Sequence, residues 1–427
     1  MNQSTNRRDF LRTGGLALAG LGFAGGNLLA QTPTTRPAGA NERIKIGSIG
    51  VGGQGAANMR AHIRNVVAVC DVDAARMATA RAAVQKSNGG ECFANEDYRR
   101  LLENKNVDAV VITTPDHWHA LPTVHACQAG KHVYCEKPLT LTIAEGRVMV
   151  RAARRHNVVV QCGSQQRSSA GFRQACELVR NGRIGQIRTV RVGIPGTNFV
   201  GPAVADSDPP KGLNYDLWLG PAPQRPYNVN RVHYKFRFFW DYSGGQLTNW
   251  GAHHLDIAQW GLGMDESGPV SCEGTARYHA ERWYEVPQFQ ELTYTYANGV
   301  RLLCGNAHRG GTTFEGEKGT IFVTRGRIES TPPEILQQPL VESDTRLTVS
   351  TNHHTNWLDA IRNNRRPICD VEIGHRSATV CHLGNIALRS GQRVQWDPVN
   401  ERIVGNAQQA AMVEKAYRAP WRLPEIG

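Results

Sequence analysis

Short apolar runs alternate with segments of helical periodicity in the first part of the chain, from residue 44 onward. Each run ends in glycine or in polar, turn-forming residues, and a stretch typical of a helix follows it. Strands that alternate with helices in this way indicate a parallel sheet with crossover helices. We therefore predict an α/β domain with a doubly wound parallel sheet over residues 44–164. The predicted strands include residues 44–49, 66–70, 107–113, 132–135 and 158–162.

The hydrophobic pattern changes after about residue 164. Segments 187–192, 288–296 and 300–304 alternate apolar and polar residues and are separated by Gly, Asn and Pro turns. Such alternation is typical of strands in a mixed or antiparallel sheet with one face in the core. With helices at 356–362 and 375–388, we expect residues 165–427 to form an α+β domain with an open mixed, largely antiparallel sheet.

One segment of this second part does not fit either pattern. Residues 195–226 are rich in Gly, Pro and Asp and are too many for a simple connection. We interpret them as a loop on the substrate side of the fold.

The first 43 residues are interpreted as a targeting segment rather than as part of the fold. Arg7 and Arg8 precede an apolar, Gly-rich run over residues 14–30, which resembles a twin-arginine (Tat) signal. A membrane anchor would need about 20 strongly apolar residues. We expect residues 1–30 to be a signal peptide recognised by the Tat translocase and residues 31–43 to be a linker. The mature protein would then be periplasmic or otherwise extracytoplasmic.

Composition and charge exclude several classes of protein. The 427 residues are 40% hydrophobic and 20% charged, which excludes disordered, fibrous and polytopic membrane proteins. The formal net charge of +12 would attract anionic substrates. No block of five like charges occurs, so we expect no nucleic-acid partner. The ten cysteines lack Cys-x-x-Cys spacing and are expected to be core thiols rather than disulfides or zinc ligands.

A glycine-rich turn follows the first predicted strand. It runs Gly50-Val51-Gly52-Gly53-Gln54-Gly55, and a helix is expected after it. Glycines at this spacing let the backbone approach a pyrophosphate, whose charge lies at the helix N-terminus. Asp71 ends the second strand, about 20 residues further on, where a carboxylate binds the adenosine ribose. The expected cofactor-binding residues here are Gly50, Gly52, Gly53, Gln54, Gly55 and Asp71, in a Rossmann fold.

Asp71 also bears on which dinucleotide is bound. A carboxylate at this position repels a 2′-phosphate and so favours NAD over NADP. Arg76, a few residues further along, keeps NADP possible. A tight turn that binds nothing is the alternative for the glycine motif.

Two further motifs lie at the carboxyl ends of predicted parallel strands, where open sheets of this class bind ligands. They are Thr114-Pro115-Asp116-His117-Trp118-His119 and Glu136-Lys137-Pro138. Together with the glycine turn, these motifs resemble the Gfo/Idh/MocA oxidoreductases, over essentially the whole mature chain. The resemblance implies an NAD-dependent dehydrogenase, which is often a homo-oligomer, with a lysine beside the nicotinamide. The further cofactor-binding residues it implies are Thr114, Pro115, His119, Glu136 and Lys137.

Chemistry supports a catalytic Lys137 independently of the resemblance. An ammonium that is desolvated beside a cationic ring has a lowered pKa, which suits a group that exchanges a proton near neutral pH. An ordinary surface lysine is the alternative. His117 and His119 have His-x-His spacing, but no third ligand is evident, so no metal site is expected.

Residues 243–256 match the glycine-started active-site helix of this family. Asn249 and His253 are four residues apart and would share one helical face, whereas His254 points about 100° away. The family usually has Asp where this chain has Asn249, and an amide cannot ionise. We therefore expect Lys137 to remove the proton, with His253 binding a substrate hydroxyl or lying satisfied in the core.

Other polar and aromatic residues near these motifs are weaker candidates. Trp240, Tyr242, Trp250 and Trp260 surround the same helix, and aromatic faces can stack on a sugar, although core packing is the commoner reason for such a cluster. The catalytic candidates are Lys137, His253 and Asn249, and the substrate candidates are Arg167, Trp250 and Asp256.

The expected location restricts the reaction. Outside the cytoplasm there is no pool of free NAD, so we expect a non-dissociating cofactor that is reoxidised in place. The favoured function is an oxidoreductase acting on a secondary alcohol of a sugar or polyol. One alternative is an NAD-dependent glycoside hydrolase or lyase that works through transient oxidation. The other is a catalytically silent binding protein, which is supported by Asn249 at the position where the family usually has Asp.

Overall fold

The computed structural model describes residues 43–197, 203–281 and 283–426. The expected Tat signal at residues 1–30 and nearly all of the expected linker lie outside the described residues, as do residues 198–202 of the expected substrate-side loop. No helix in the described ranges is long and apolar enough to cross a bilayer.

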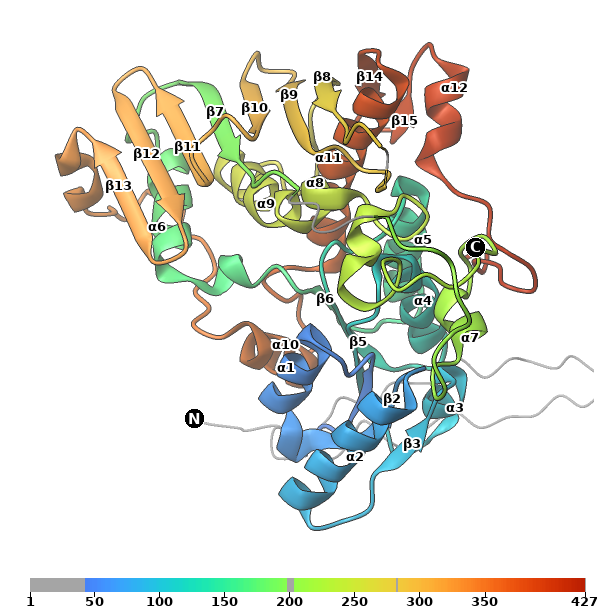
Figure 1. Cartoon of the computed structure of the whole chain (residues 1–427). Helices are drawn as coiled ribbons and strands as arrows, with labels where there is room; N and C mark the ends of the chain where they lie inside the picture. Colours follow the sequence, from blue (N-terminus) through green and yellow to red (C-terminus); the bar gives the residue numbers. More distant parts are fainter. Residues whose placement is uncertain (1–42, 198–202, 282, 427) are drawn as a thin grey trace, which may run out of the picture. The chain divides into compact units, whose positions relative to one another are not determined.

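A six-stranded parallel sheet forms the first part of the fold (Figure 1). Its strand order is β3-β2-β1-β4-β5-β6, so the direction of winding reverses between β1 and β4. Two hydrophobic clusters cover the two faces of the sheet, which explains the nearly continuous burial of its strands. The strands are β1 (Ile46–Ile49), β2 (Val66–Cys70), β3 (Phe93–Asn95), β4 (Ala109–Ile112), β5 (His132–Cys135) and β6 (Val160–Cys162). The predicted doubly wound Rossmann sheet is confirmed.

Helices connect these strands, and several of them begin with polar caps. Asp73 accepts hydrogen bonds from Ala75 and Arg76 at the start of α2, and Thr142 forms a capping box with Glu145 at the start of α5. The helices are α1 (Gln54–Ala61), α2 (Ala74–Asn88), α3 (Tyr98–Glu103), α4 (Ala120–Gln128) and α5 (Ile143–Arg155). Helix α10 (His353–Arg362), from late in the chain, also packs on this sheet through Trp357.

A nine-stranded sheet forms the second part of the fold (Figure 1). Its order is β13-β12-β11-β7-β10-β9-β8-β14-β15, and only the pair β7 and β10 is parallel among the described strand pairs, so the predicted mixed, largely antiparallel sheet is confirmed. Its strands are β7 (Ile187–Gly193), β8 (Ser271–Arg277), β9 (Phe289–Thr295), β10 (Arg301–Gly305), β11 (Gly311–Gly316), β12 (Gly319–Thr324), β13 (Arg327–Thr331), β14 (Val394–Asp397) and β15 (Arg402–Ile403).

Long helices of the second part pack in the same hydrophobic core as this second sheet. They are α6 (Ala170–Arg180), α9 (Gly251–Leu262) and α11 (Val371–Ser390). Helix α11 also contacts α5 of the first part, so it belongs to the contact between the two sheets. The ten cysteines are all buried and free, as expected for core thiols.

A segment of the second part crosses to the first sheet, and we call residues 212–238 the clasp. It contains α7 (Tyr215–Leu219) and the short 3-10 helix His233–Phe238. Ala74 N donates to Gly212 O at 2.9 Å, and Asn214 N donates to Val72 O at 2.9 Å. These backbone bonds attach the clasp just beyond the carboxyl end of β2. Its aromatic side chains pack in a cluster of their own.

Candidate active site

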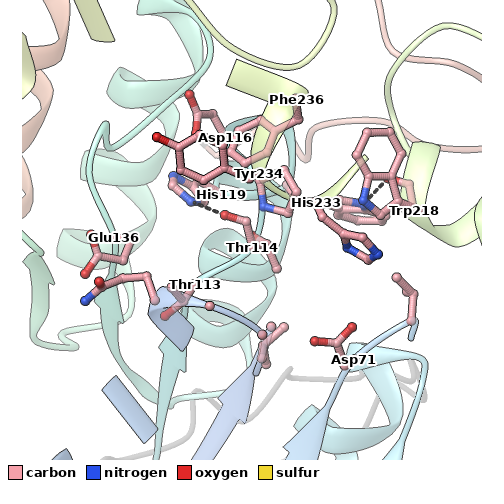
Figure 2. A pocket seen from close by; sticks show the side chains of 18 of the residues that line it. Asp71, Thr113, Thr114, Asp116, His119, Glu136, Trp218, His233, Tyr234 and Phe236 are labelled. Atoms are coloured by element: carbon pink, nitrogen blue, oxygen red, sulfur yellow. Dashed lines mark hydrogen bonds between the residues drawn. The ribbon is translucent and has the colours of Figure 1, made fainter. Parts of the chain in front are cut away.

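A cavity of about 510 Å³ lies at the carboxyl ends of the parallel strands. The glycine turn and the ends of β2, β4 and β5 line it from the first part of the fold, and the clasp, α9 and the turn after β12 line it from the second. Figure 2 shows Glu136 at one end of this cavity and Asp71 with His233 at the other. This is the edge at which doubly wound sheets bind their ligands.

The glycine turn has a backbone that only glycine adopts easily. Gly50 and Gly53 have φ of 77° and 49°, in the left-handed region. A Cβ at Gly50 would lie 2.7 Å from Thr113 O, and a Cβ at Gly55 would lie 2.0 Å from Gly50 O. Gly55 therefore lies behind the turn and allows α1 to pack against it, while Gly50, Gly52, Gly53 and Gln54 line the cavity. The arrangement fits a pyrophosphate at the start of α1.

Asp71 lies at the other end of the cavity from Glu136 and already has two backbone partners. Its Oδ2 accepts from Val51 N at 2.8 Å and its Oδ1 accepts from Asp73 N at 3.0 Å. Burial raises the pKa of Asp71. Each carboxylate oxygen has a second acceptor site, so the residue can hold the glycine turn and still accept from ribose hydroxyls. Arg76 extends over Gly52, where a Cβ would lie 2.3 Å from its Nη1.

The residues after β4 combine a free polar atom with a fixed histidine. Thr114 lines the cavity, and its Oγ1 is buried with no hydrogen-bond partner among the described residues. His119 also lines it, with Nδ1 2.7 Å from Pro138 O and Nε2 2.9 Å from Thr114 O. His119 therefore holds the backbone beside Lys137, and the orphaned hydroxyl of Thr114 suits a ligand such as a dinucleotide.

Glu136 and Lys137 lie where the two parts of the fold meet. Glu136 accepts from Asn58 Nδ2 at 2.9 Å and from Lys137 N at 3.1 Å. Lys137 Nζ donates to the side-chain Oδ1 of Asn249 at 3.0 Å and to its main-chain oxygen at 3.1 Å. Burial lowers the pKa of Lys137, although Glu136 opposes the shift. The lysine is therefore poised to lose its proton more easily than a surface lysine.

The expected single helix over residues 243–256 is two helices in the structure. Helix α8 (Gly245–Asn249) ends before Trp250, and α9 begins at Gly251. Asn249 and His253 still both line the cavity, but Asn249 Nδ2 donates to Gln246 Oε1 at 3.1 Å and its oxygens accept from Lys137. The polar atoms of Asn249 therefore bind Lys137 and Gln246, and no hydrogen bond among the described residues joins them to His253.

His253 is a neutral histidine with a free ring nitrogen. Burial, and then the charge of Lys137, hold the pKa of His253 well below its usual range. Its Nδ1 has no hydrogen-bond partner among the described residues. A neutral imidazole can still accept or donate a hydrogen bond to a hydroxyl. His254 stacks on Trp250 instead, at 5.9 Å between ring centroids, and does not line the cavity.

Arg167 and Asp256, expected to contact substrate, are paired with each other away from the cavity lining. Arg167 Nε lies 2.8 Å from Asp256 Oδ2, and the side chains are 1% and 0% exposed. Arg167 also binds Asp265 at 2.8 Å and stacks over Trp260 at 5.0 Å. Both side chains are bound to protein partners inside the core and do not line the cavity. The structure therefore gives Arg167 and Asp256 a structural role instead of the expected contact with substrate. Trp250, the third candidate, does line the cavity.

Sequence reasoning missed several residues of the cavity wall. Asp116 is buried and accepts from Ser243 Oγ at 2.5 Å, and burial raises its pKa. His233, Arg237 and Arg325 come from the second part of the fold. Only Asp116 had a local signal, its place in the segment after β4, because the 3-10 helix with His233 and Arg237 and the turn with Arg325 carry no recognisable motif.

The structure also shows how metal-ligating side chains and the remaining aromatic candidates are placed in the described part of the chain. The described residues contain no group of three or more His, Cys, Asp or Glu side chains that could hold a metal ion. Trp260 and Tyr242 are buried in hydrophobic clusters, and Trp240 lies between Arg389 and Lys415. Of the four aromatic candidates, only Trp250 lines the cavity.

Comparison with known families identifies both parts of the chain. Residues 44–164 match the description "Oxidoreductase family, NAD-binding Rossmann fold", and residues 196–423 match "Oxidoreductase family, C-terminal alpha/beta domain". Both descriptions are of the Gfo/Idh/MocA oxidoreductases. The two matches together cover most of the chain and both walls of the cavity.

Similar proteins agree with this match. An uncharacterised oxidoreductase of Streptococcus pneumoniae is 31% identical over 332 residues, which are 74% of this chain and 79% of that protein. Inositol 2-dehydrogenase of Salmonella typhimurium is 35% identical over 149 residues, 34% of this chain and 43% of that enzyme. The solved WlbA dehydrogenase of Bordetella pertussis, in complex with NADH and UDP-GlcNAcA, has the same fold: the TM-score is 0.62 at 21% identity, over 83% of this chain and 99% of that one.

Proposed function

The chain belongs to the Gfo/Idh/MocA family of oxidoreductases, and from this premise we propose that it oxidises or reduces a secondary alcohol of a sugar or polyol with NAD bound in the cavity. The similarity of 149 residues of the chain to an inositol 2-dehydrogenase supports a polyhydroxylated substrate. The glycine turn, Asp71 and the unpaired hydroxyl of Thr114 fit the dinucleotide.

The observation that carries this proposal is the position of Lys137. Its Nζ is buried in the cavity wall and hydrogen-bonded only to neutral oxygens of Asn249 among its described contacts. A lysine desolvated in this way can act as a base near neutral pH. Surface lysines do not have these surroundings.

The proton route follows from the same contacts. When bound, the nicotinamide supplies the acceptor for a hydride from the substrate carbon. Neutral Lys137 takes the proton of the hydroxyl on that carbon, and the oxygens of Asn249 stabilise the resulting ammonium. His253, uncharged and with a free nitrogen, orients the hydroxyl. The alcohol becomes a ketone, and the reverse steps reduce it.

We also propose that the cofactor is retained between turnovers. The clasp is bonded to Val72 and Ala74, and His233 Nε2 lies 3.6 Å from Asp73 Oδ2 at the ribose end of the cavity. A cofactor in the glycine turn would be enclosed from this side, and its release would require the clasp to move. The carboxylate of Asp71 supports NAD as the bound cofactor. Because Arg76 lies near the glycine turn, binding of NADP is to be measured beside binding of NAD.

Retention suits the location proposed for the protein. The twin arginine at Arg7 and Arg8 supports export by the Tat translocase, which carries folded cargo, to the periplasm or another extracytoplasmic space. A homo-oligomer is proposed from family membership. Fractionation of cells and light scattering of the mature protein test these two points.

Purified mature protein tests the function directly. It is incubated with a panel of sugars, polyols and aryl glycosides while absorbance at 340 nm and released aglycone are followed. Stoichiometric absorbance without aglycone supports the dehydrogenase, and aglycone without lasting absorbance supports redox-assisted hydrolysis instead. Neither signal, with NAD bound, indicates a binding protein without catalysis. A protein that binds no NAD removes the proposal altogether.

A further inference from the structure

Two arginines line the cavity without a carboxylate partner. Arg237 and Arg325 both come from the second part of the fold, and neither forms an ion pair in the described part of the chain. Most buried or half-buried arginines of this protein are paired; Arg167 and Arg147, for example, each have two acidic partners. Arg237 is half-buried and Arg325 is exposed to solvent, and an unpaired guanidinium that lines a cavity is free to bind an anion.

Arg325 is held in place by neutral groups. Its Nε donates to Gln166 Oε1 at 3.1 Å, and Gln166 Nε2 donates to His253 O at 3.3 Å. Its Cζ lies 4.9 Å from the ring centroid of Trp250. These contacts fix the plane of the guanidinium and leave Nη1 and Nη2 with no partner among the described residues. The Nη1 and Nη2 atoms form the edge of a guanidinium that can bind a carboxylate through two parallel hydrogen bonds.

The position of Arg325 is on the substrate side of the cavity. It lies in the turn between β12 and β13, and its contacts are Gln166 and Trp250. Gln166 links it to His253, and the charge of Arg325 contributes to lowering the pKa of both His253 and Lys137. No described contact joins it to the glycine turn or to Asp71. It therefore lies beside the reacting groups and away from the adenosine end.

The charges around the reacting groups favour an anion. Arg237 and Arg325 are cationic groups of this wall, whereas Glu136 accepts hydrogen bonds from Asn58 and from the backbone of Lys137. Asp116, the other acid, is bonded to Ser243. Arg237 stacks over Tyr234, with 4.6 Å between its Cζ and the ring centroid. Within the described residues, neither Glu136 nor Asp116 forms an ion pair with the two guanidinium groups, which therefore remain available to attract an acidic ligand.

We propose that the substrate carries an acid group, a carboxylate or a phosphate, which is bound by the free Nη atoms of Arg325. The inference rests on the proposed function and narrows its substrate class from sugars and polyols in general to their acids. Arg325 is then a specificity residue, because an acid group would form charge-assisted hydrogen bonds with its Nη atoms that a neutral sugar cannot form.

Calorimetric titration of the NADH-loaded protein tests the charge preference without turnover. The probes are matched pairs that differ in one charge: glucuronate and glucuronamide, galacturonate and galacturonamide, gluconate and gluconamide. We expect at least one acid to bind on the order of 10 to 100 times more tightly than its amide, the range for a charge-assisted bidentate contact. Glucose 6-phosphate against glucose separates phosphate from carboxylate.

Variants show whether Arg325 is the cause. Arg325→Gln should remove the preference for the acid and leave binding of the amide within about twofold, and Arg325→Lys should restore part of it. Arg277→Gln is the matched control, because Arg277 also stacks on an aromatic ring, Phe289 at 4.3 Å, but does not line the cavity. A preference that survives Arg325→Gln, or no preference in any pair, overturns the inference.

The result is independent of whether the protein is a dehydrogenase. A charge preference without any change at 340 nm would uphold the role of Arg325 and remove the dehydrogenase. Oxidation of neutral sugars as fast as of their acids would uphold the dehydrogenase and remove the role of Arg325.

Discussion

Lys137 and Asn249 meet across the boundary between the two parts of the fold, 112 residues apart in sequence. The lysine follows β5, the asparagine ends α8, and Nζ lies 3.0 Å from the amide oxygen. An amide accepts this hydrogen bond without adding a negative charge. The pairing therefore orients the lysine while leaving its pKa lowered by burial.

Replacement of Lys137 by Met should lower kcat by about 100-fold to 10,000-fold, the usual contribution of a positioned base. Bound NAD should remain, because the glycine turn and Asp71 are untouched. Steady-state kinetics and the 260 nm absorbance of the purified variant check both expectations. Lys86→Met, at an exposed helix position, is the control. Normal turnover in the Lys137 variant would exclude the lysine as the base.

Replacement of Asn249 by Asp should move the rising limb of kcat/KM to higher pH. A neutral lysine is the active form, so activity increases as pH passes through its pKa, which burial lowers. A carboxylate about 3 Å away favours the ammonium and should raise that pKa by roughly one unit or more. Asn249→Ala removes the hydrogen bond without adding charge and should not cause the upward shift. An unchanged profile for Asn249→Asp would contradict the assigned partnership.

Breaking the Arg167–Asp256 pair should reduce stability rather than substrate affinity. Asp256→Asn leaves the guanidinium of Arg167, 1% exposed, with Asp265 as its remaining acidic partner, and we expect a loss of up to about 3–5 kcal/mol, the cost of removing one partner of a buried pair. Urea denaturation measures the change. Arg188→Gln, which breaks an exposed pair with Glu317, should change the free energy of unfolding by less than about 1 kcal/mol. Equal effects of the two variants would contradict the structural role.

Removal of the His233 side chain should speed release of the cofactor. His233 Nε2 lies 3.6 Å from Asp73 Oδ2, and each loss of about 1 kcal/mol from the barrier to clasp movement corresponds to roughly fivefold in rate. Stopped-flow fluorescence of NADH, displaced by excess NAD, gives the rate. His156→Ala, at the end of α5 and outside the cavity lining, should have no effect. An unaltered rate in the His233 variant would show that the clasp does not retain the cofactor.

Local features of the sequence determined the first sheet and the cofactor end of the cavity. Strand runs, turn glycines and the residues that follow each strand are neighbours in the chain, and all parallel strands present their carboxyl ends at one edge. Gly50, Asp71 and Lys137 could therefore be assigned to one cavity from their places after β1, β2 and β5. The fold of the second sheet followed from alternation in the same way.

Partners that lie far apart in sequence were decided only by the tertiary structure. Helical spacing places Asn249 and His253 on one face, but it does not say that Lys137 takes the amide, or that Arg167 and Asp256 neutralise each other in the core. Arg325 lies in a turn and His233 in the 3-10 helix of the clasp, both without a motif, and they reach the cavity because the second sheet and the clasp are packed against the first. Hydrophobic periodicity determines which face of an element is buried, whereas ion pairs and hydrogen bonds depend on what the opposite element presents.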